Sequence, residues 1–112
     1  MASDEYAYLT TTGRVSGRPH TIEIWYAMEG KTVYLLSGGG DRSDWVLNLM
    51  RNPSVRLRIG DEEHQGSARV LAAGTEDEAA RDAVFGKYQP RYRGSLVSWR
   101  AESLAVAIDL HP

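Results

Sequence analysis

The sequence predicts a mainly β (β+α) domain over residues 1–112: a six-stranded antiparallel β-barrel with two helices. Runs rich in β-branched and aromatic residues, several with alternating apolar and polar side chains, predict the strands. The elements are expected in the order β-β-β-α-β-β-α-β, and a parallel doubly wound sheet is not expected because strands and helices do not alternate singly. Closing short antiparallel strands into a barrel removes their exposed edges.

Three strands are expected before the first helix. Residues 6–12 are β-branched and aromatic, and the glycines of residues 13–17 predict a turn after them. Residues 21–28 alternate between apolar and polar side chains and form the second strand. A tight turn at residues 29–31 leads into the third strand at residues 32–37.

A helix is expected over residues 41–52, with Ser43 as its N-cap. Val46, Leu49 and Met50 lie on one face of this helix, and the Asn-Pro pair that follows ends it. The alternating residues 54–59 form the next strand.

The second half of the chain supplies the last strands and the second helix. Residues 65–72 return as the partner of the preceding strand. Thr75 and Glu78 form a capping box, which predicts a helix from about residue 76 to residue 87. Alternating apolar residues over 104–110 predict the final strand.

Composition excludes several classes of protein. A net charge of −2 argues against a general nucleic-acid binder, which would carry a basic excess. Without cysteine there are no disulfides, thiolate nucleophiles or Cys-based metal sites. The polar, acidic N-terminus and the lack of a membrane-length apolar run predict a cytoplasmic protein with no integral membrane segment. Because so short a chain buries a modest share of its surface, a homodimer would help to stabilise it.

The turn after the first strand is the first candidate binding segment. It combines two guanidinium groups, a hydroxyl and glycines that let a ligand approach the backbone, in Arg14, Ser16, Gly17 and Arg18. Such a turn suits a phosphate or carboxylate group. The alternative is an ordinary hairpin turn with solvated arginines.

A second candidate segment joins the third strand to the first helix. Its backbone amides are free to point into a pocket next to a helix N-terminus, and it consists of Ser37, Gly38, Gly39 and Gly40. It is neither a Walker loop nor a Rossmann fingerprint. The alternative is a flexible connection.

Aromatic residues mark the remaining candidates. Trp45 could wall a ring-shaped cofactor to which the Asn48 amide bonds, or the two could serve the core and a neighbouring loop. Residues 87–93, with Tyr88 and Tyr92, interleave aromatic and cationic side chains, which suits a substrate mouth or the rim of a dimer. The three histidines lack a metal-binding spacing, so no metal site is expected.

Three motifs in order carry a family resemblance. They are Leu-Thr-Thr-Thr-Gly-Arg-x-Ser-Gly-x-Pro at residues 9–19, Tyr-Leu-Leu-Ser-Gly-Gly-Gly at 34–40, and Trp-x-x-Asn-Leu at 45–49 with Asn-Pro at 52–53. These residues resemble the deazaflavin (coenzyme F420)-dependent nitroreductase family. That family belongs to the flavin- and deazaflavin-binding split β-barrel oxidoreductases, which include the pyridoxamine phosphate oxidase-like proteins. The resemblance covers about residues 9–72 and implies a six-stranded antiparallel split β-barrel.

The resemblance also implies roles for the candidate segments. The turn would hold the phosphate and tail of F420, the serine-glycine loop would contact the deazaflavin ring, and Trp45 and Asn48 would lie beside the cofactor. The implied activity is hydride transfer from reduced F420 to an organic acceptor such as a quinone, a nitroaromatic compound or an enone. The proton would come from solvent, from Tyr88 or from Tyr92.

Two departures from the family pattern leave alternatives open. Val15 and Gly38 stand where relatives usually carry lysine, so two cations that would bind phosphate are missing. The alternatives are an FMN-dependent split barrel and a protein that carries a cofactor, haem or lipid without turnover. A small-molecule acceptor and a second copy of the chain are the expected partners.

Overall fold

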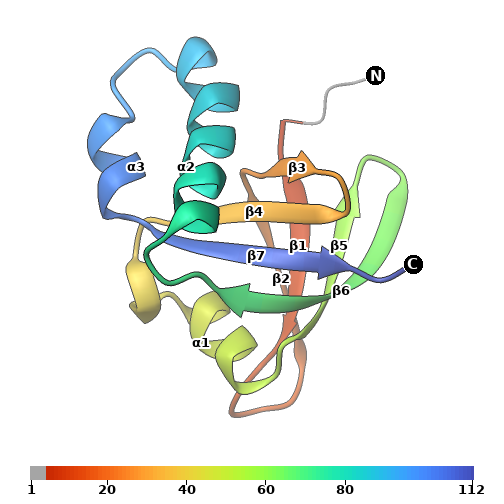
Figure 1. Ribbon diagram of the computed structural model, residues 1–112. Helices are drawn as coiled ribbons and strands as arrows, with labels where there is room; N and C mark the ends of the chain where they lie inside the picture. The colour runs from red at the N-terminus through yellow and green to blue at the C-terminus, as the bar shows by residue number, and fades with distance from the viewer. Residues whose placement is uncertain (1–4) are drawn as a thin grey trace.

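Seven strands form one antiparallel sheet in the computed structural model, which describes residues 5–112 (Figure 1). They are β1 (Ala7–Thr12), β2 (Pro19–Ile24), β3 (Ala27–Glu29), β4 (Thr32–Ser37), β5 (Ser54–Ile59), β6 (Glu62–Val70) and β7 (Leu104–Leu110). The strand order is β2-β1-β5-β6-β7-β4-β3. Because the two edge strands, β2 and β3, are consecutive in the chain, the sheet curls round until its edges meet at their connection. The predicted mainly β, antiparallel barrel is confirmed.

The helices lie at the ends of the strands and on one face of the sheet (Figure 1). They are η1 (Gly40–Arg42), α1 (Asp44–Arg51), α2 (Thr75–Tyr88), η2 (Gln89–Arg91) and α3 (Val97–Glu102). The first expected helix is therefore divided at Ser43, whose backbone is extended.

The predicted strand at residues 21–28 is wrong in one respect, because it is two strands broken at Trp25 and Tyr26. The Trp25 ring stacks on the Tyr88 ring, with centroids 4.4 Å apart. The Tyr26 N–H donates to the Tyr88 hydroxyl, and the Tyr26 carbonyl accepts from Lys87. The backbone polar groups of Tyr26 thus bond to α2 rather than to a neighbouring strand, which adds a seventh strand to the expected six.

The third α-helix, α3, was not predicted. It has only six residues and is fastened to α2 by its arginine and its backbone. Arg100 pairs with Glu78, at 3.1 Å, and with Asp82, while the Arg81 guanidinium donates to the Arg100 carbonyl. These contacts span about twenty residues of sequence, so no local pattern marks the helix.

The predicted capping box is also wrong. Gly74, not Thr75, is the N-cap of α2, and no side chain of the described residues caps this helix end. The Glu78 carboxylate bonds to Arg100 instead of reaching back to the helix N-terminus. Tertiary ion pairing has therefore replaced the local cap.

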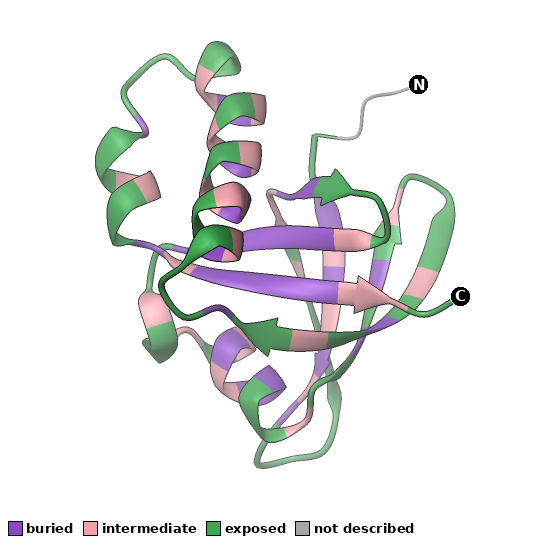
Figure 2. Cartoon of the chain, in the orientation of Figure 1, coloured by how far each residue is buried: buried purple, intermediate pink, exposed green. Residues whose placement is uncertain are grey.

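Two apolar cores lie on opposite faces of β4 and β7. The barrel interior holds residues such as Leu9, Leu35, Leu57 and Ile108, all within 1% of complete burial. The second core lies between the sheet and α2, where small residues of β7 such as Ala105 and Ala107 meet the helix. Both faces of these two strands are covered, so they form the continuous buried band of Figure 2.

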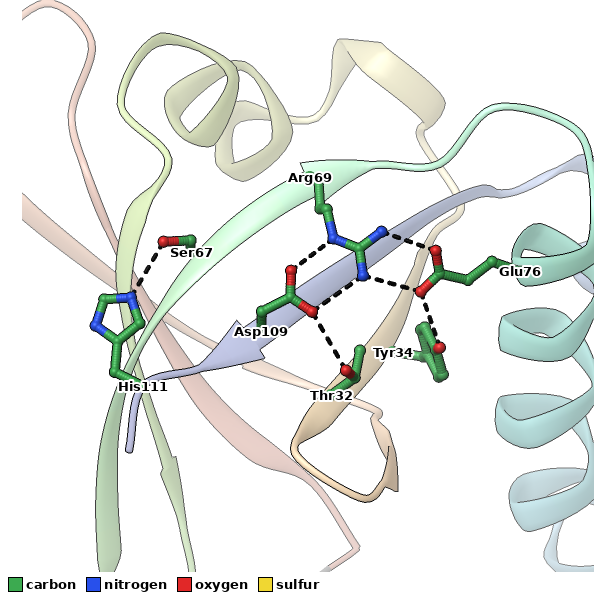
Figure 3. A network of polar contacts seen from close by, with 7 residues as sticks. All are labelled: Thr32, Tyr34, Ser67, Arg69, Glu76, Asp109 and His111. Atoms are coloured by element: carbon green, nitrogen blue, oxygen red, sulfur yellow. Dashed lines mark hydrogen bonds and ion pairs between the residues drawn. The ribbon is translucent and has the colours of Figure 1, made fainter.

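A polar network fastens α2 to the outer face of the sheet (Figure 3). Arg69 of β6 lies between Asp109 of β7, at 2.6 Å, and Glu76 of α2, at 2.7 Å. The Tyr34 hydroxyl donates to Glu76, and Thr32 donates to Asp109. Hydrogen bonds from Arg69 hold the pKa values of Glu76 and Asp109 below their ordinary ranges.

These shifts predict how stability depends on pH. A carboxyl group with a lowered pKa in the folded state binds fewer protons there than in the unfolded chain, so its contribution is lost as the pH falls. We expect the melting temperature to fall between about pH 5 and pH 3, and we expect Arg69→Gln to remove part of that fall. Thermal melts at both pH values test this. Arg58→Gln, which removes an arginine that contacts Tyr8 and Gly60, is the control; an unchanged pH profile in Arg69→Gln would contradict the prediction.

Candidate cofactor site

A pocket of about 480 Å³ opens between the β1–β2 turn and α1, which lie together at one end of the barrel (Figure 1). Its walls come from the turn, from the facing ends of β1 and β2, and from the first turns of α1. The lining residues are Thr11, Gly13, Arg14, Val15, Ser16, His20, Thr21, Ile22, Asp44, Trp45 and Asn48. A second hollow of about 380 Å³ lies along the same turn and reaches Arg51 and Asn52.

The backbone of the turn leaves two donors available to a ligand. The Gly13 N–H donates to the Arg18 carbonyl at 2.7 Å, and the Gly17 N–H returns to the Gly13 carbonyl at 2.9 Å. Among the described residues, the N–H groups of Val15 and Ser16 have no hydrogen-bond partner. Both residues line the pocket, and adjacent free amides of this kind bind anions and carbonyl oxygens.

Two glycines allow the turn to take this shape. Gly17 has a φ of 75°, a left-handed conformation that other residues adopt at a cost. A Cβ on Gly13 would lie 2.7 Å from His20 Nε2 and 2.8 Å from Ser16 Oγ. Gly13 therefore lets the imidazole and the hydroxyl close over the turn.

His20 is a pocket residue that sequence reasoning missed, since spacing alone gave the histidines no role. A usable signal existed in the hairpin itself. His20 pairs with Thr11 across β1 and β2, so a pocket beside Thr11 places His20 at its wall.

Arg14 and Asn48 meet in the structure. The Asn48 side chain accepts from the Arg14 backbone N–H at 3.1 Å and from its guanidinium at 2.9 Å. The guanidinium also pairs with Asp44 at 3.1 Å. Arg14 is therefore bound to α1 within the protein. Trp45, one residue past Asp44, lines the same pocket and packs against the barrel core.

The serine-glycine loop does not line this pocket. The Ser37 hydroxyl, 2% exposed, donates to the Gly40 carbonyl and lies 2.8 Å from Ser43 Oγ. Ser43 occupies the predicted N-cap position of α1, but its hydroxyl bonds to Ser37 instead of capping the helix. A Cβ on Gly39 would overlap Ser43 Oγ, at 2.5 Å. The loop is thus packed against the start of α1, beside the pocket rather than in it.

Gly38 lies next to Trp99, which lines an aromatic pocket of about 390 Å³. A Cβ on Gly38 would lie 3.1 Å from Trp99 Nε1. This pocket is lined by Trp25, Tyr92, Ser95, Leu96 and Trp99. The rings of Tyr92 and Trp99 are nearly perpendicular to the Trp25 ring, at 81° and 82°. The Trp25 ring therefore forms the base of the pocket, and the other two rings form its sides.

Arg18 and Tyr88 also line neither of these two pockets. Arg18 is exposed, and its backbone N–H donates to Ser16 Oγ. Tyr88 is 3% exposed, and its hydroxyl accepts from the Tyr26 N–H and lies 2.5 Å from the Glu5 carbonyl. Burial raises the pKa of Tyr88 to about 12, so this hydroxyl holds its proton firmly.

These features define a class of protein: a small β-barrel with a ligand-binding pocket at the turn of its first hairpin. Residues 1–108 match the family model of the F420H(2)-dependent quinone reductases. The chain belongs to that family, as the motif resemblance implied. Within residues 5–112, no helix is long and apolar enough to span a membrane.

Individual relatives agree with this assignment. An F420H(2)-dependent quinone reductase of Mycobacterium tuberculosis strain H37Rv is 31% identical over 74 residues, 63% of this chain and 50% of that protein. The chain thus spans about half the length of the curated relatives it matches.

Solved structures confirm the split-barrel fold. An F420-H2 dependent reductase, FDR-A, is 23% identical, with a TM-score of 0.74 over 93% of each chain. A structure described as a domain-swapped dimer is 21% identical, with a TM-score of 0.77 over 96% of this chain and 81% of that one.

Proposed function

We propose that the protein is an F420H2-dependent reductase that transfers a hydride to an organic acceptor such as a quinone. Family membership over residues 1–108 supports this proposal. The observation that carries it is the pocket, which is lined by Val15 and Ser16 with their free N–H groups on one side and by the first turns of α1, including Trp45, on the other. When bound, reduced F420 would supply the hydride.

The residues present suit such a cofactor. Polar backbone donors at the turn would hold its phosphate or carbonyl oxygens, and Ser16 would add a hydroxyl. Trp45 would lie against its flat ring. The second hollow, with Arg51 at its edge, would give room for an anionic tail. Val15, at 94% exposure, leaves the turn tip without a cation, which keeps FMN as the competing cofactor.

We place the acceptor in the aromatic pocket of Trp25, Tyr92 and Trp99. Three aromatic faces suit a flat ring such as a quinone. Hydride transfer needs the acceptor in direct contact with the cofactor ring, so the bound ring would have to extend past the serine-glycine loop, where a Cβ on Gly38 would lie 3.1 Å from Trp99 Nε1. The proton would come from solvent or from the exposed hydroxyl of Tyr92, and we assign no proton transfer to Tyr88.

The proposal is tested by mixing the purified protein anaerobically with F420H2 and a soluble naphthoquinone. Oxidation of F420H2, followed by its returning absorbance, should depend on both protein and quinone. No protein-dependent oxidation across a panel of quinones, nitroaromatics and enones would contradict the proposal. We also propose a cytoplasmic homodimer, which the domain-swapped neighbour supports and a sedimentation experiment would check.

Trp99→Ala tests the place of the acceptor. Losing one aromatic wall should raise the KM for the quinone by about 3- to 10-fold, while the Kd for F420H2 stays unchanged. Val97→Ala, at an exposed position on the same helix, is the matched control and should change neither constant. An equal loss of F420H2 affinity in Trp99→Ala would place the cofactor, not the acceptor, in this pocket.

A further inference from the structure

Asn48 of α1 is buried, and its side chain forms hydrogen bonds to other parts of the protein. It is 4% exposed, although it lines the pocket. Its carbonyl oxygen accepts two hydrogen bonds from Arg14, and its amide donates to the Thr11 hydroxyl at 3.1 Å. A side-chain carbonyl oxygen has two lone pairs, so this acceptor is full. Asn48 thus joins the turn, β1 and α1 at one point.

These bonds set the direction of the Arg14 amide in the turn. The Arg14 N–H points at Asn48, while the next two N–H groups, of Val15 and Ser16, have no partner among the described residues. The Arg14 guanidinium adds a second link, because it bonds to Asn48 and also to Asp44 at 3.1 Å. If the Arg14 amide were released, the turn would keep its internal hydrogen bonds at Gly13, Gly17 and Arg18 but would lose its backbone link to α1.

We infer that Asn48 is a positioning residue: it holds Arg14 in place so that the Val15 and Ser16 amides face the pocket, and its carbonyl oxygen makes no bond to the ligand. Arg14 accordingly acts through the fold and not as a free phosphate-binding cation. Both roles differ from the ones that the family resemblance implies. The inference rests on the proposed function for the identity of the ligand, but the geometry of the turn can be measured without any ligand.

The first experiment uses the free protein. Amide hydrogen exchange, followed residue by residue by NMR, should show the Arg14 amide exchanging about 10-fold faster in Asn48→Ala than in the natural protein. Met50→Ala, at an exposed position on the same helix, is the control and should leave this amide unchanged. Unchanged exchange at Arg14 in Asn48→Ala would overturn the inference.

The second experiment asks whether Asn48 and Arg14 act as one unit. Kd values for oxidised F420 are measured for Asn48→Ala, Arg14→Met and the double variant. A positioning pair predicts a loss of about 10-fold in each single variant and no further loss in the double variant. Losses that multiply would show that the two side chains contact the ligand separately and would overturn the inference.

The two failures are distinguishable. If the natural protein binds no F420, the proposed function fails, and the exchange measurement alone then decides the role of Asn48. If Asn48→Ala does not fold, Arg14→Met replaces it, because its side chain is 35% exposed and lies at the surface. Loss of the Arg14 guanidinium should still speed hydrogen exchange of the turn amides. Unchanged exchange rates of these amides would contradict the inference that Arg14 and Asn48 together hold the turn.

Discussion

Gly66→Ala is expected to destabilise the protein by about 1–3 kcal/mol, an effect typical of overpacking a core. Gly66 is a buried residue of β6 that pairs with Leu110 of β7. A Cβ there would lie 2.8 Å from the Asp109 carbonyl oxygen and 2.8 Å from a methyl group of Ile108. The carbonyl belongs to the strand backbone and cannot rotate away, so β6 and β7 must separate.

Urea denaturation measures this loss, and Gly86→Ala is the matched control. Gly86 lies in α2 with no atom within 4 Å of an added Cβ. The same substitution there should stabilise the protein by about 0.5–1 kcal/mol, because alanine favours the helix. If Gly66→Ala were as stable as the natural protein, the pairing of β6 with β7 would be wrong.

Trp45→Leu is expected to weaken F420 binding by about 10- to 100-fold. Stacking of a flat heteroaromatic ring on an aromatic side chain contributes about 1–3 kcal/mol, which leucine cannot supply. Leucine keeps the apolar contact of Trp45 with the barrel core, so most of the stability should remain. Fluorescence titration with F420 measures the affinity, and the melting temperature controls for folding. An unchanged Kd in a folded Trp45→Leu variant would remove Trp45 from the binding site.

Most of the barrel could be predicted from the sequence because each strand carries its own local signal. The strands β4 and β5 begin and end where alternation and turn residues predict. The break at Tyr26 could not be predicted in this way. It depends on Tyr88, which lies 62 residues further along the chain. The Tyr88 hydroxyl forms hydrogen bonds with the backbone N–H and carbonyl of Tyr26.

In the candidate site too, features with a local sequence signal could be predicted, and features that depend on distant contacts could not. Local glycines and the motif order mark the turn and Trp45, and the structure brings both to one pocket. The partners of Arg14 could not be seen in sequence, because Asn48 lies 34 residues away and the bond depends on how α1 packs beneath the hairpin. The packing of the glycine loop could not be seen in the sequence for a similar reason, since Gly38 lies next to Trp99, which is distant in the chain.

A comparison of the affinities for two cofactors tests the central proposal most directly. The natural protein and Trp45→Leu are each titrated with oxidised F420 and, separately, with FMN. We predict saturable binding of one F420 per chain, weaker binding of FMN, and loss of F420 affinity in the variant. No F420 binding, or tighter binding of FMN that Trp45→Leu leaves unchanged, would contradict an F420 site between the β1–β2 turn and α1.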